Sequence, residues 1–404
     1  MSELDDLHAA ILADPDSDEP RLVYADALQA AGDPRGELIA IQCELARLGC
    51  DRTRLALWDP PSEQSTHRRR DWIADAFVDA SRSTVRALRA REAQLLASHG
   101  EAWSSGSPNA RFRRGFVEHL HVRTLPDAGL AGLPLLRSLE VDEFRDDPVL
   151  PGLEQLRCSL AGDACHEAFR ASAGRSTLRE LALADHGVLD PIDLAELPRT
   201  LFTNLRALDL CGYPLATPSQ LQELTSSLEE LRLGEHASEE GAAILEVASR
   251  GSSLSTLDCY LLEAGDYHAL FEPGFAGLQA LRIHELELPD VSPVLALNAL
   301  RVLDLGGTPS AGLIYALAKD DHLFSLSQLG LRESEIESHH LAMLSQTPLF
   351  SRLRVLDLSA NVGLTEVFDI GASESLELID LRGTQIRDIA RLQQRCPNAE
   401  ILTS

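Results

Sequence analysis

Twelve segments of the chain repeat one short template, L-x-x-L-x-L, with apolar residues at its first, fourth and sixth positions. Successive copies start 17 to 27 residues apart. An internal repeat of this length predicts a solenoid, in which each repeat buries its apolar side against its neighbours. The copies begin at Val117, Leu136, Leu153, Leu178, Leu205, Leu228, Leu254, Leu278, Leu300, Leu326, Leu353 and Leu376.

This period and template are those of leucine-rich repeats. The predicted fold is therefore an α/β solenoid, a right-handed leucine-rich-repeat horseshoe of about twelve repeats with a parallel concave sheet. Segments 238–251, 310–320 and 338–346 are predicted as helices of the outer side, whereas the short step after Leu136 leaves room only for a loop. At the ninth position only Asn361 keeps the asparagine that bonds the turn backbone; Thr308, Ser334 and Thr384 do part of that work.

An all-α domain is predicted ahead of the repeats. Its first helix covers LDDLHAAILAD, its second opens at Pro20 and stops at Gly32, and its third has Asp33 as N-cap, Pro34 as first residue and Gly49 as stop. One face of the third helix is apolar, with Leu38, Ile41, Leu45 and Leu48.

Three domains follow from these patterns. Residues 1–50 form the helical domain, residues 51–115 a helical, partly inserted basic connector and N-terminal cap, and residues 116–404 the repeat array. Terminal repeats need a cap, and residues 88–115 are expected to cover the first one.

The segment RLVYADALQAAGDPRGELIAIQCELARL resembles the repeat-companion domain found ahead of leucine-rich repeats in myxobacterial and planctomycete proteins. Ala27 replaces the family's usual Trp. The resemblance covers about 1–50 and 88–122, and implies a bacterial repeat protein without implying an activity. The matching residues are Tyr24, Ala25, Asp26, Leu28, Gly32, Asp33, Pro34, Arg35, Gly36, Glu37 and Gln42, then Leu95, Leu96, His99, Gly100, Trp103 and Arg114 to Val117.

Charge is unevenly distributed along the chain. The formal net charge is −27, with −8 in residues 1–50, +4 in 51–115 and −23 in 116–404. A protein this acidic disfavours nucleic acid and anionic membranes as partners. The basic segment 51–87 is open to three interpretations: packing of the helical domain on the array, docking of an acidic peptide, or nucleic-acid contact through Arg68, Arg69 and Arg70.

Neither a basic, apolar secretion signal nor a run of about 20 apolar residues is present, so a cytoplasmic protein is expected. The seven cysteines include no C-x-x-C pair and are expected to be reduced and buried.

No catalytic or cofactor motif stands out: P-loop, G-x-G-x-x-G, H-E-x-x-H and G-x-S-x-G patterns are all missing. His339 and His340 are adjacent, and adjacent residues of a helix point about 100° apart, which disfavours a shared metal site. The sequence therefore predicts neither an enzyme nor a bound cofactor or metal.

The fifth position of each copy projects from the concave side of the predicted sheet, together with the third and seventh. From Asp209 to Asp304 the fifth-position charges alternate in sign across strands about 4.8 Å apart. One interpretation is an exposed cross-strand salt ladder, in which loss of Arg232 would barely change stability. The other is a recognition strip, whose candidate residues are Asp209, Arg232, Asp258, Tyr260, Arg282, His284, Asp304, Arg332, Asp357, Asp380 and Arg382.

Tyr260 and His284 are the candidate anchors beside the alternating row. Asp357 and Asp380, near Arg332 and Arg382, form a second, uncompensated region. The predicted function is a monomeric, non-catalytic interaction module or scaffold that binds an unknown partner protein through the concave face. An inhibitor or regulatory subunit of a partner enzyme is the alternative, because fold alone does not decide function.

Overall fold

The chain divides into two compact units, Met1–Ala182 and Leu183–Ser404. The structure, a computed structural model, describes residues 3–48, 82–104, 109–124, 130, 133–142, 152–158, 177–183, 203–210, 221, 227–233, 253–260, 275–284, 292–319, 323–367 and 370–403.

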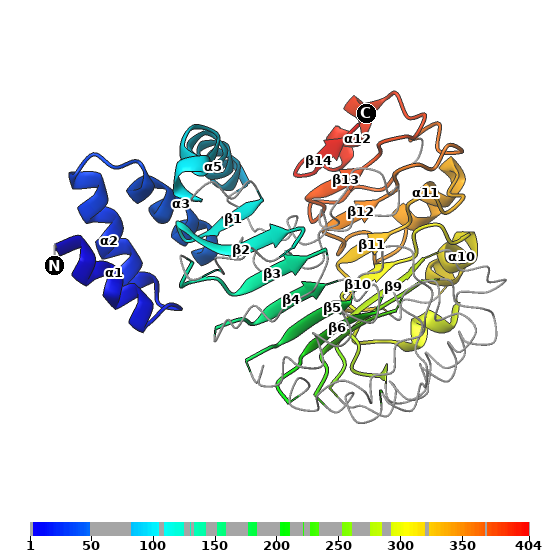
Figure 1. Ribbon diagram of the computed structural model, residues 1–404. Helices are drawn as coiled ribbons and strands as arrows, with labels where there is room; N and C mark the ends of the chain where they lie inside the picture. Colours follow the sequence, from blue (N-terminus) through cyan, green and yellow to red (C-terminus); the bar gives the residue numbers. More distant parts are fainter. Residues whose placement is uncertain are drawn as a thin grey trace. The chain divides into compact units, whose positions relative to one another are not determined.

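Fourteen strands of the described residues form one sheet, in the order in which they occur in the chain (Figure 1). β1 and β2 are antiparallel, and the described pairs from β2 onward are parallel. The first unit contains β1 (Ala110–Arg113), β2 (Phe116–Val122), β3 (Ser138–Val141) and β4 (Gln155–Cys158), and the boundary between the units falls within β5 (Glu180–Leu183). The second contains β6 (Ala207–Leu210), β7 (Glu230–Leu233), β8 (Thr256–Tyr260), β9 (Ala280–His284), β10 (Val302–Asp304), β11 (Gln328–Gly330), β12 (Val355–Asp357), β13 (Leu378–Asp380) and β14 (Glu400–Leu402).

The strands from β2 to β13 coincide with the twelve sequence copies, which confirms one short strand per copy. Leucines at the fourth position face one another in register, for example Leu231, Leu257 and Leu281, and each is fully or almost fully buried. These stacked leucines are the core of the solenoid, because each repeat covers the apolar side of the next.

Two strands were not predicted. β1 lies in a connector expected to be helical, and it pairs with β2 through a turn at Arg114 and Gly115, both with positive φ (47° and 82°). Two consecutive residues with positive φ are typical of the tight turns of β-hairpins. β14 follows the last sequence copy and pairs in register with β13.

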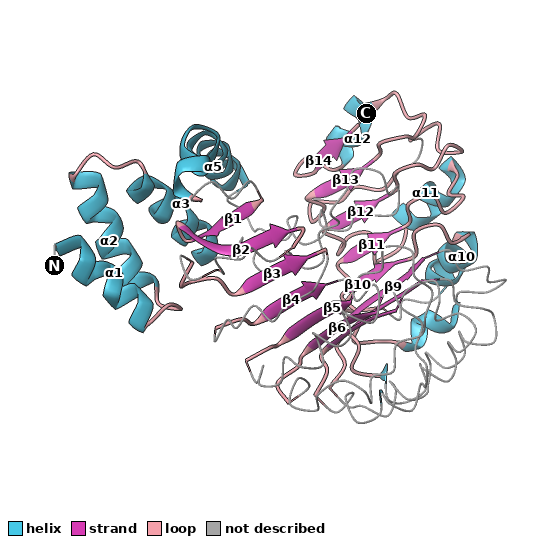
Figure 2. Ribbon diagram, viewed as in Figure 1, coloured by secondary structure: helices cyan, strands magenta, loops and turns pink. Residues whose placement is uncertain are grey.

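Helices accompany the strands in the second unit. α10 (Ala311–Lys319) and α11 (Ser338–Ser345) confirm two of the predicted helices, and they lie beside the strands in Figure 2. Glu337 is the N-cap of α11, and its backbone N–H donates to Nδ1 of His340 at 3.1 Å. η8 (Ser292–Ala296) and α12 (Ile389–Arg395) complete the helices described there. The predicted helix at 238–251 lies outside the described residues, and so does the middle of the short step after Leu136.

Asn361 bonds the turn backbone as predicted. Its Oδ1 accepts from the backbone N–H of Ser334 and Ile336, at 3.0 and 2.9 Å, and its Nδ2 donates to the carbonyl of Leu331 at 2.7 Å. The hydroxyl of Ser334 donates to the carbonyl of Leu305 at 2.9 Å, so a shorter side chain does part of the same work one repeat earlier.

The N-terminal helices are α1 (Glu3–Ala13), α2 (Asp18–Ala30), α3 (Arg35–Arg47) and α5 (Arg82–Trp103). α2 begins at Asp18, two residues before the expected start. The predicted apolar face of α3 is confirmed, because it forms a core cluster with Leu95 of α5 and with Phe112 of β1.

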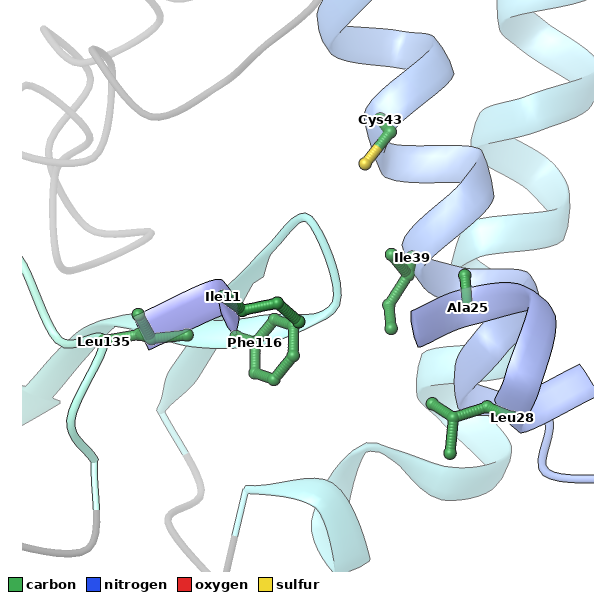
Figure 3. Packing of buried hydrophobic residues seen from close by; sticks show 7 residues of the cluster. All are labelled: Ile11, Ala25, Leu28, Ile39, Cys43, Phe116 and Leu135. Carbon is green, nitrogen blue, oxygen red and sulfur yellow. The ribbon is translucent and has the colours of Figure 1, made fainter. Parts of the chain in front are cut away.

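A second core cluster joins the helices to the start of the repeats (Figure 3). Residues from α1, α2 and α3 share it with Phe116 of β2 and Leu135, whose side chains are about 5 % exposed. Residues 88–115 were expected to form the cap, but the first three helices supply most of this cluster. Its members are Ile11, Ala25, Leu28, Ile39, Cys43, Phe116 and Leu135.

Two side chains of α3 hold the β1–β2 hairpin. Gln42 of α3 accepts from the N–H of Gly115 at 2.6 Å and donates to the carbonyl of Phe112 at 3.1 Å. Arg35 donates to the carbonyl of Gly115 at 3.1 Å and lies over the ring of Phe116. A side chain at Gly115 would collide with Ile39, which explains a glycine at this turn.

A buried ion pair lies beside this hairpin. The Arg21 guanidinium donates to Glu118 at 2.7 Å, and both side chains are almost completely buried. It also donates to the carbonyls of Pro15 and Arg114. Because each buried charge has close partners, the pair fixes α2 against β2.

Four of the seven cysteines lie in the described residues, and all four are buried thiols. Burial raises the pKa of the Cys43 thiol to about 12, so it stays protonated. No helix of the described residues is long and apolar enough to cross a membrane.

Candidate functional site

The open face of the sheet in the second unit carries the third and fifth residues of each repeat copy. These residues alternate with the buried residues of the fourth and sixth positions, because successive side chains of a strand point to opposite faces. The parallel registers align the fifth positions strand by strand. The resulting fifth-position row consists of Asp209, Arg232, Asp258, Arg282, Asp304, Gly330, Asp357 and Asp380.

Arg232 forms ion pairs on both sides within this row. Its Nη1 lies 3.0 Å from Oδ2 of Asp209, and its Nε lies 3.2 Å from Oδ2 of Asp258. The three side chains are only 6–7 % exposed. The alternating register is therefore as predicted, but the expectation of an exposed, weak ladder is wrong for these three residues.

Ion pairing stops at Arg282, although its neighbours in register are Asp258 and Asp304. Among the described residues Arg282 has no ion pair, and its buried Nε has no hydrogen-bond partner. Tyr260 and His284 are register partners on β8 and β9, but their side chains lie outside what the structure describes.

The aspartates near the C-terminus bond the backbone two residues ahead. Oδ1 of Asp304, Asp357 and Asp380 accepts from the N–H of Gly306, Ser359 and Arg382, at 3.1, 2.8 and 3.0 Å. This bond closes the turn that follows each strand, as short polar side chains often do. A fifth-position aspartate therefore has a local structural role here.

Asp380 was expected to be uncompensated, and that expectation is wrong. Nε of Arg382 donates to Oδ1 and Oδ2 of Asp380, at 2.9 and 3.0 Å, and its Nη2 also contacts Oδ2. Arg332 is the other arginine that was expected near this pair of aspartates. Its Nη2 lies 3.9 Å from Oε2 of Glu333, as an ion pair.

Asp357 differs from Asp380 because, among the described residues, no arginine forms an ion pair with it. Burial raises the pKa of this carboxyl to about 7, the hydrogen bonds from Ser359 lower it, and the charges of Asp380 and Asp304 raise it further. The carboxyl group is therefore partly protonated near neutral pH.

The first unit carries a separate charged row at the equivalent positions. His121, Glu140 and Arg157 are aligned in register, and Nε of Arg157 lies 3.3 Å from Oε1 of Glu140. Burial raises the pKa of Glu140, and Arg157 opposes that shift.

A further set of ion pairs was missed by sequence reasoning. Second-position residues of adjacent copies pair, as in Arg206 with Glu229 (3.4 Å) and Arg354 with Glu377 (2.7 Å). The signal was present in the sequence, because arginine and glutamate exchange at this position between neighbouring copies.

His339 and His340 approach more closely than their positions on a helix suggested, with ring centroids 3.8 Å apart. Burial, with the neighbouring His339, lowers the pKa of His340. Its Nδ1 accepts the Glu337 backbone bond that caps α11, which a protonated ring could not do. In the described part of the chain, no three histidine, cysteine or carboxylate side chains are grouped so as to hold a metal ion.

No family model and no curated protein matches the chain. Among solved structures it is similar to internalin C2 of Listeria monocytogenes, with 19% identity and a TM-score of 0.33, covering 57% of this chain and 82% of the other. It is also similar to a leucine-rich-repeat protein of Leptospira interrogans, with 15% identity and a TM-score of 0.26, covering 70% and 93%. A TLR13 structure in complex with an RNA matches with 14% identity and a TM-score of 0.41, covering 71% and 52%.

The twelve copies and their in-register parallel strands define the class of this protein. It is a leucine-rich-repeat protein with an all-α N-terminal part.

Proposed function

We propose that this protein is a non-catalytic protein–protein interaction module that binds a partner protein through the open face of β6–β13. The observation that carries the proposal is the in-register fifth-position row, in which the half-buried Arg282 and Asp304 follow the buried trio of Asp209, Arg232 and Asp258 along that face. Preorganised polar groups bind a partner without the entropy cost of ordering them first.

The partner is proposed to be a protein because a solenoid of this kind offers a long, rigid face and not an enclosed pocket. The net charge of −27 disfavours nucleic acid and anionic membranes as partners. We also propose that the protein is a monomer and works in the cytoplasm.

The first experiment is affinity purification of the full-length protein from its native host, followed by mass spectrometry and an affinity measurement on each purified candidate. Asp304→Asn and Arg332→Ala, at half-buried side chains, are the test variants on the open face. Arg47→Ala on α3, where the side chain is 68 % exposed, is the control.

A binding role predicts that at least one open-face variant weakens the partner about 30-fold or more, the size of a hot-spot effect of about 2 kcal/mol. The control should change affinity by less than about threefold. Unchanged affinity in both test variants would refute the open face as the binding site. Inhibition of a purified partner enzyme at one-to-one stoichiometry would favour the inhibitor or regulatory-subunit alternative over a scaffold.

A further inference from the structure

The first turn of α11 contains two adjacent histidines, His339 and His340, directly after the N-cap residue Glu337 and Ser338. Their ring centroids lie 3.8 Å apart. His340 is 6 % exposed, whereas the side chain of His339 is 55 % exposed. A positive charge is unfavourable at this end of a helix, because the helix dipole is positive there. The position therefore suits two neutral rings better than two charged ones.

The ring of His340 takes part in the cap of the helix. The backbone N–H of Glu337 donates to Nδ1 of His340 at 3.1 Å, and the backbone N–H of His340 donates to the carbonyl of Glu337 at 3.0 Å. A bond from the third helical residue back to the N-cap is half of a capping box, a role that glutamate or glutamine usually has. Because Nδ1 accepts, the neutral ring carries its proton on Nε2, and a second proton on Nδ1 would break the bond.

Few groups near His340 favour its charged form. Its own turn presents His339 and Glu337, α10 presents the ring of Tyr315 with centroids 5.6 Å apart, and the turn after β12 carries Glu366. Burial and the charge of His339 lower the pKa of His340, and the charge of Glu337 opposes them. The carboxylate of Glu337 lies beside the other ring, 3.3 Å from Nδ1 of His339.

The first turn of α11 also holds the next repeat. The hydroxyl of Ser338 accepts from the backbone N–H of Thr365 and of Glu366, at 3.1 and 3.0 Å, in the turn that follows β12. Glu337 packs against the same turn, because a Cβ built on Gly363 would lie 3.2 Å from its Cγ. Residues 337 and 338 thus connect the cap of α11 to a turn one repeat later in the chain.

We propose that the first turn of α11 is a pH-sensitive latch between two repeats, closed by neutral His340 and opened when Nδ1 takes up a proton. In the open form the N–H of Glu337 loses its acceptor and the first turn frays. The bonds from Thr365 and Glu366 to Ser338 then weaken, because their acceptor is no longer held in place. The latch uses no residue of the fifth-position row, so it does not depend on the proposed function.

The direction of the pH effect follows from the lowered pKa of His340. The folded protein binds this proton less readily than the unfolded chain, in which the ring has its ordinary pKa of about 6.5. The contribution of the closed latch to stability is therefore present above about pH 6.5 and is lost as the pH falls below that value. Asp357 titrates near pH 7 with the opposite sign, so the melting temperature of the whole protein combines the two effects. A local measurement separates them.

Amide hydrogen exchange of the full-length protein at pH 7.5 and pH 5.0, corrected for the intrinsic exchange rates, is that measurement. We expect the protection of Glu337, Thr365 and Glu366 to be roughly tenfold lower at pH 5.0, the size of losing an N-cap bond. Protection of Leu231 in β7 should be unchanged. The ¹⁵N chemical shifts of the His340 ring should show the Nε2–H tautomer at pH 7.5.

Variants then assign the response to one ring. His340→Gln keeps a side-chain acceptor that does not titrate, so the protection of Glu337 should be equal at both pH values. His340→Ala removes the acceptor, and protection should be low at both. His339→Gln, at the exposed neighbouring ring, is the matched control and should keep the pH response.

Three results would overturn the proposal: equal protection of Glu337 at both pH values in the wild type, an Nδ1–H tautomer of His340 at pH 7.5, or a pH response that persists in His340→Gln. Loss of the response in His339→Gln would assign the titration to the exposed ring, and the role of His340 would then be refuted.

Discussion

Asp357 shows how a single side chain of the row depends on its surroundings. Its carboxyl is buried, and burial raises its pKa far above the ordinary value of an aspartate, to about 7; the charges of Asp380 and Asp304 raise it further. The folded protein therefore holds the proton more tightly than the unfolded chain does. Stability contributed by this group is present below about pH 4 and is lost as the pH rises towards 7.

Asp357→Asn removes the titration while keeping an oxygen that accepts from the N–H of Ser359. We expect the stability of this variant relative to the wild type to rise as the pH increases from 4 to 8. The difference in the free energy of unfolding between variant and wild type should be larger at pH 8 than at pH 4 by about 2–4 kcal/mol. Denaturant unfolding at both pH values measures the change. Asp26→Asn on the exposed side of α2 is the control, and an equal effect of Asp357→Asn at both pH values would contradict the prediction.

Arg232 differs most from what its sequence pattern predicted, which was an exposed and weakly paired side chain. Because its two ion pairs are buried, Arg232→Met should destabilise the protein by about 3–5 kcal/mol, leaving two buried carboxylates uncompensated. Neutralising those carboxylates in the same chain, with Asp209→Asn and Asp258→Asn, should recover much of the loss. Thermal unfolding of both variants tests this. An unchanged melting temperature for Arg232→Met would show that the trio contributes as little to stability as exposed ion pairs do.

Among the secondary-structure elements, the β1–β2 hairpin is bonded to α3 through Gln42. Gln42 satisfies a backbone donor at Gly115 and a backbone acceptor at Phe112, and its amide also donates to Glu92 of α5 at 2.7 Å. One side chain thus joins two helices and a hairpin.

Gln42→Leu leaves those two buried backbone groups without partners, at a cost of about 1–3 kcal/mol each. We expect faster amide hydrogen exchange at Gly115 and across β1, while exchange in β10–β13 stays as in the wild type. Gln29→Leu, at an exposed position of α2, is the matched control. Protected amides throughout β1 in Gln42→Leu would show that the hairpin is stable by itself.

At the scale of the whole molecule, the helical domain supplies part of the core of the first repeats. Phe116 and Leu135 share a buried cluster with side chains of α1, α2 and α3, and Glu118 is buried against Arg21. A repeat array with an uncovered end exposes apolar surface that an interior repeat would bury.

Deletion of residues 1–115 should therefore give an aggregated or poorly soluble fragment. Size-exclusion chromatography and thermal unfolding of 116–404 measure this. A milder variant, Arg21→Met with Glu118→Gln in the full chain, keeps the apolar cap and should remain monomeric, because it removes the buried charges together. A soluble, monomeric and cooperatively unfolding 116–404 fragment would show that the cap is dispensable.

The repeat template alone predicted twelve of the fourteen described strands and the residues of each that share a face. Leucines at the fourth and sixth positions must be buried, so Asp209, Arg232 and Asp258 had to align on the other face, whatever else surrounds them. How deeply those charged side chains are buried, and which groups they contact, follows from the tertiary structure alone. That Asp304 leans over Gly330 and leaves Arg282 unpaired depends on the residue present on the next strand and on the rotamer it permits. A repeat template specifies directions, whereas burial and pairing follow from neighbours about 25 residues away in the chain, which no local pattern contains.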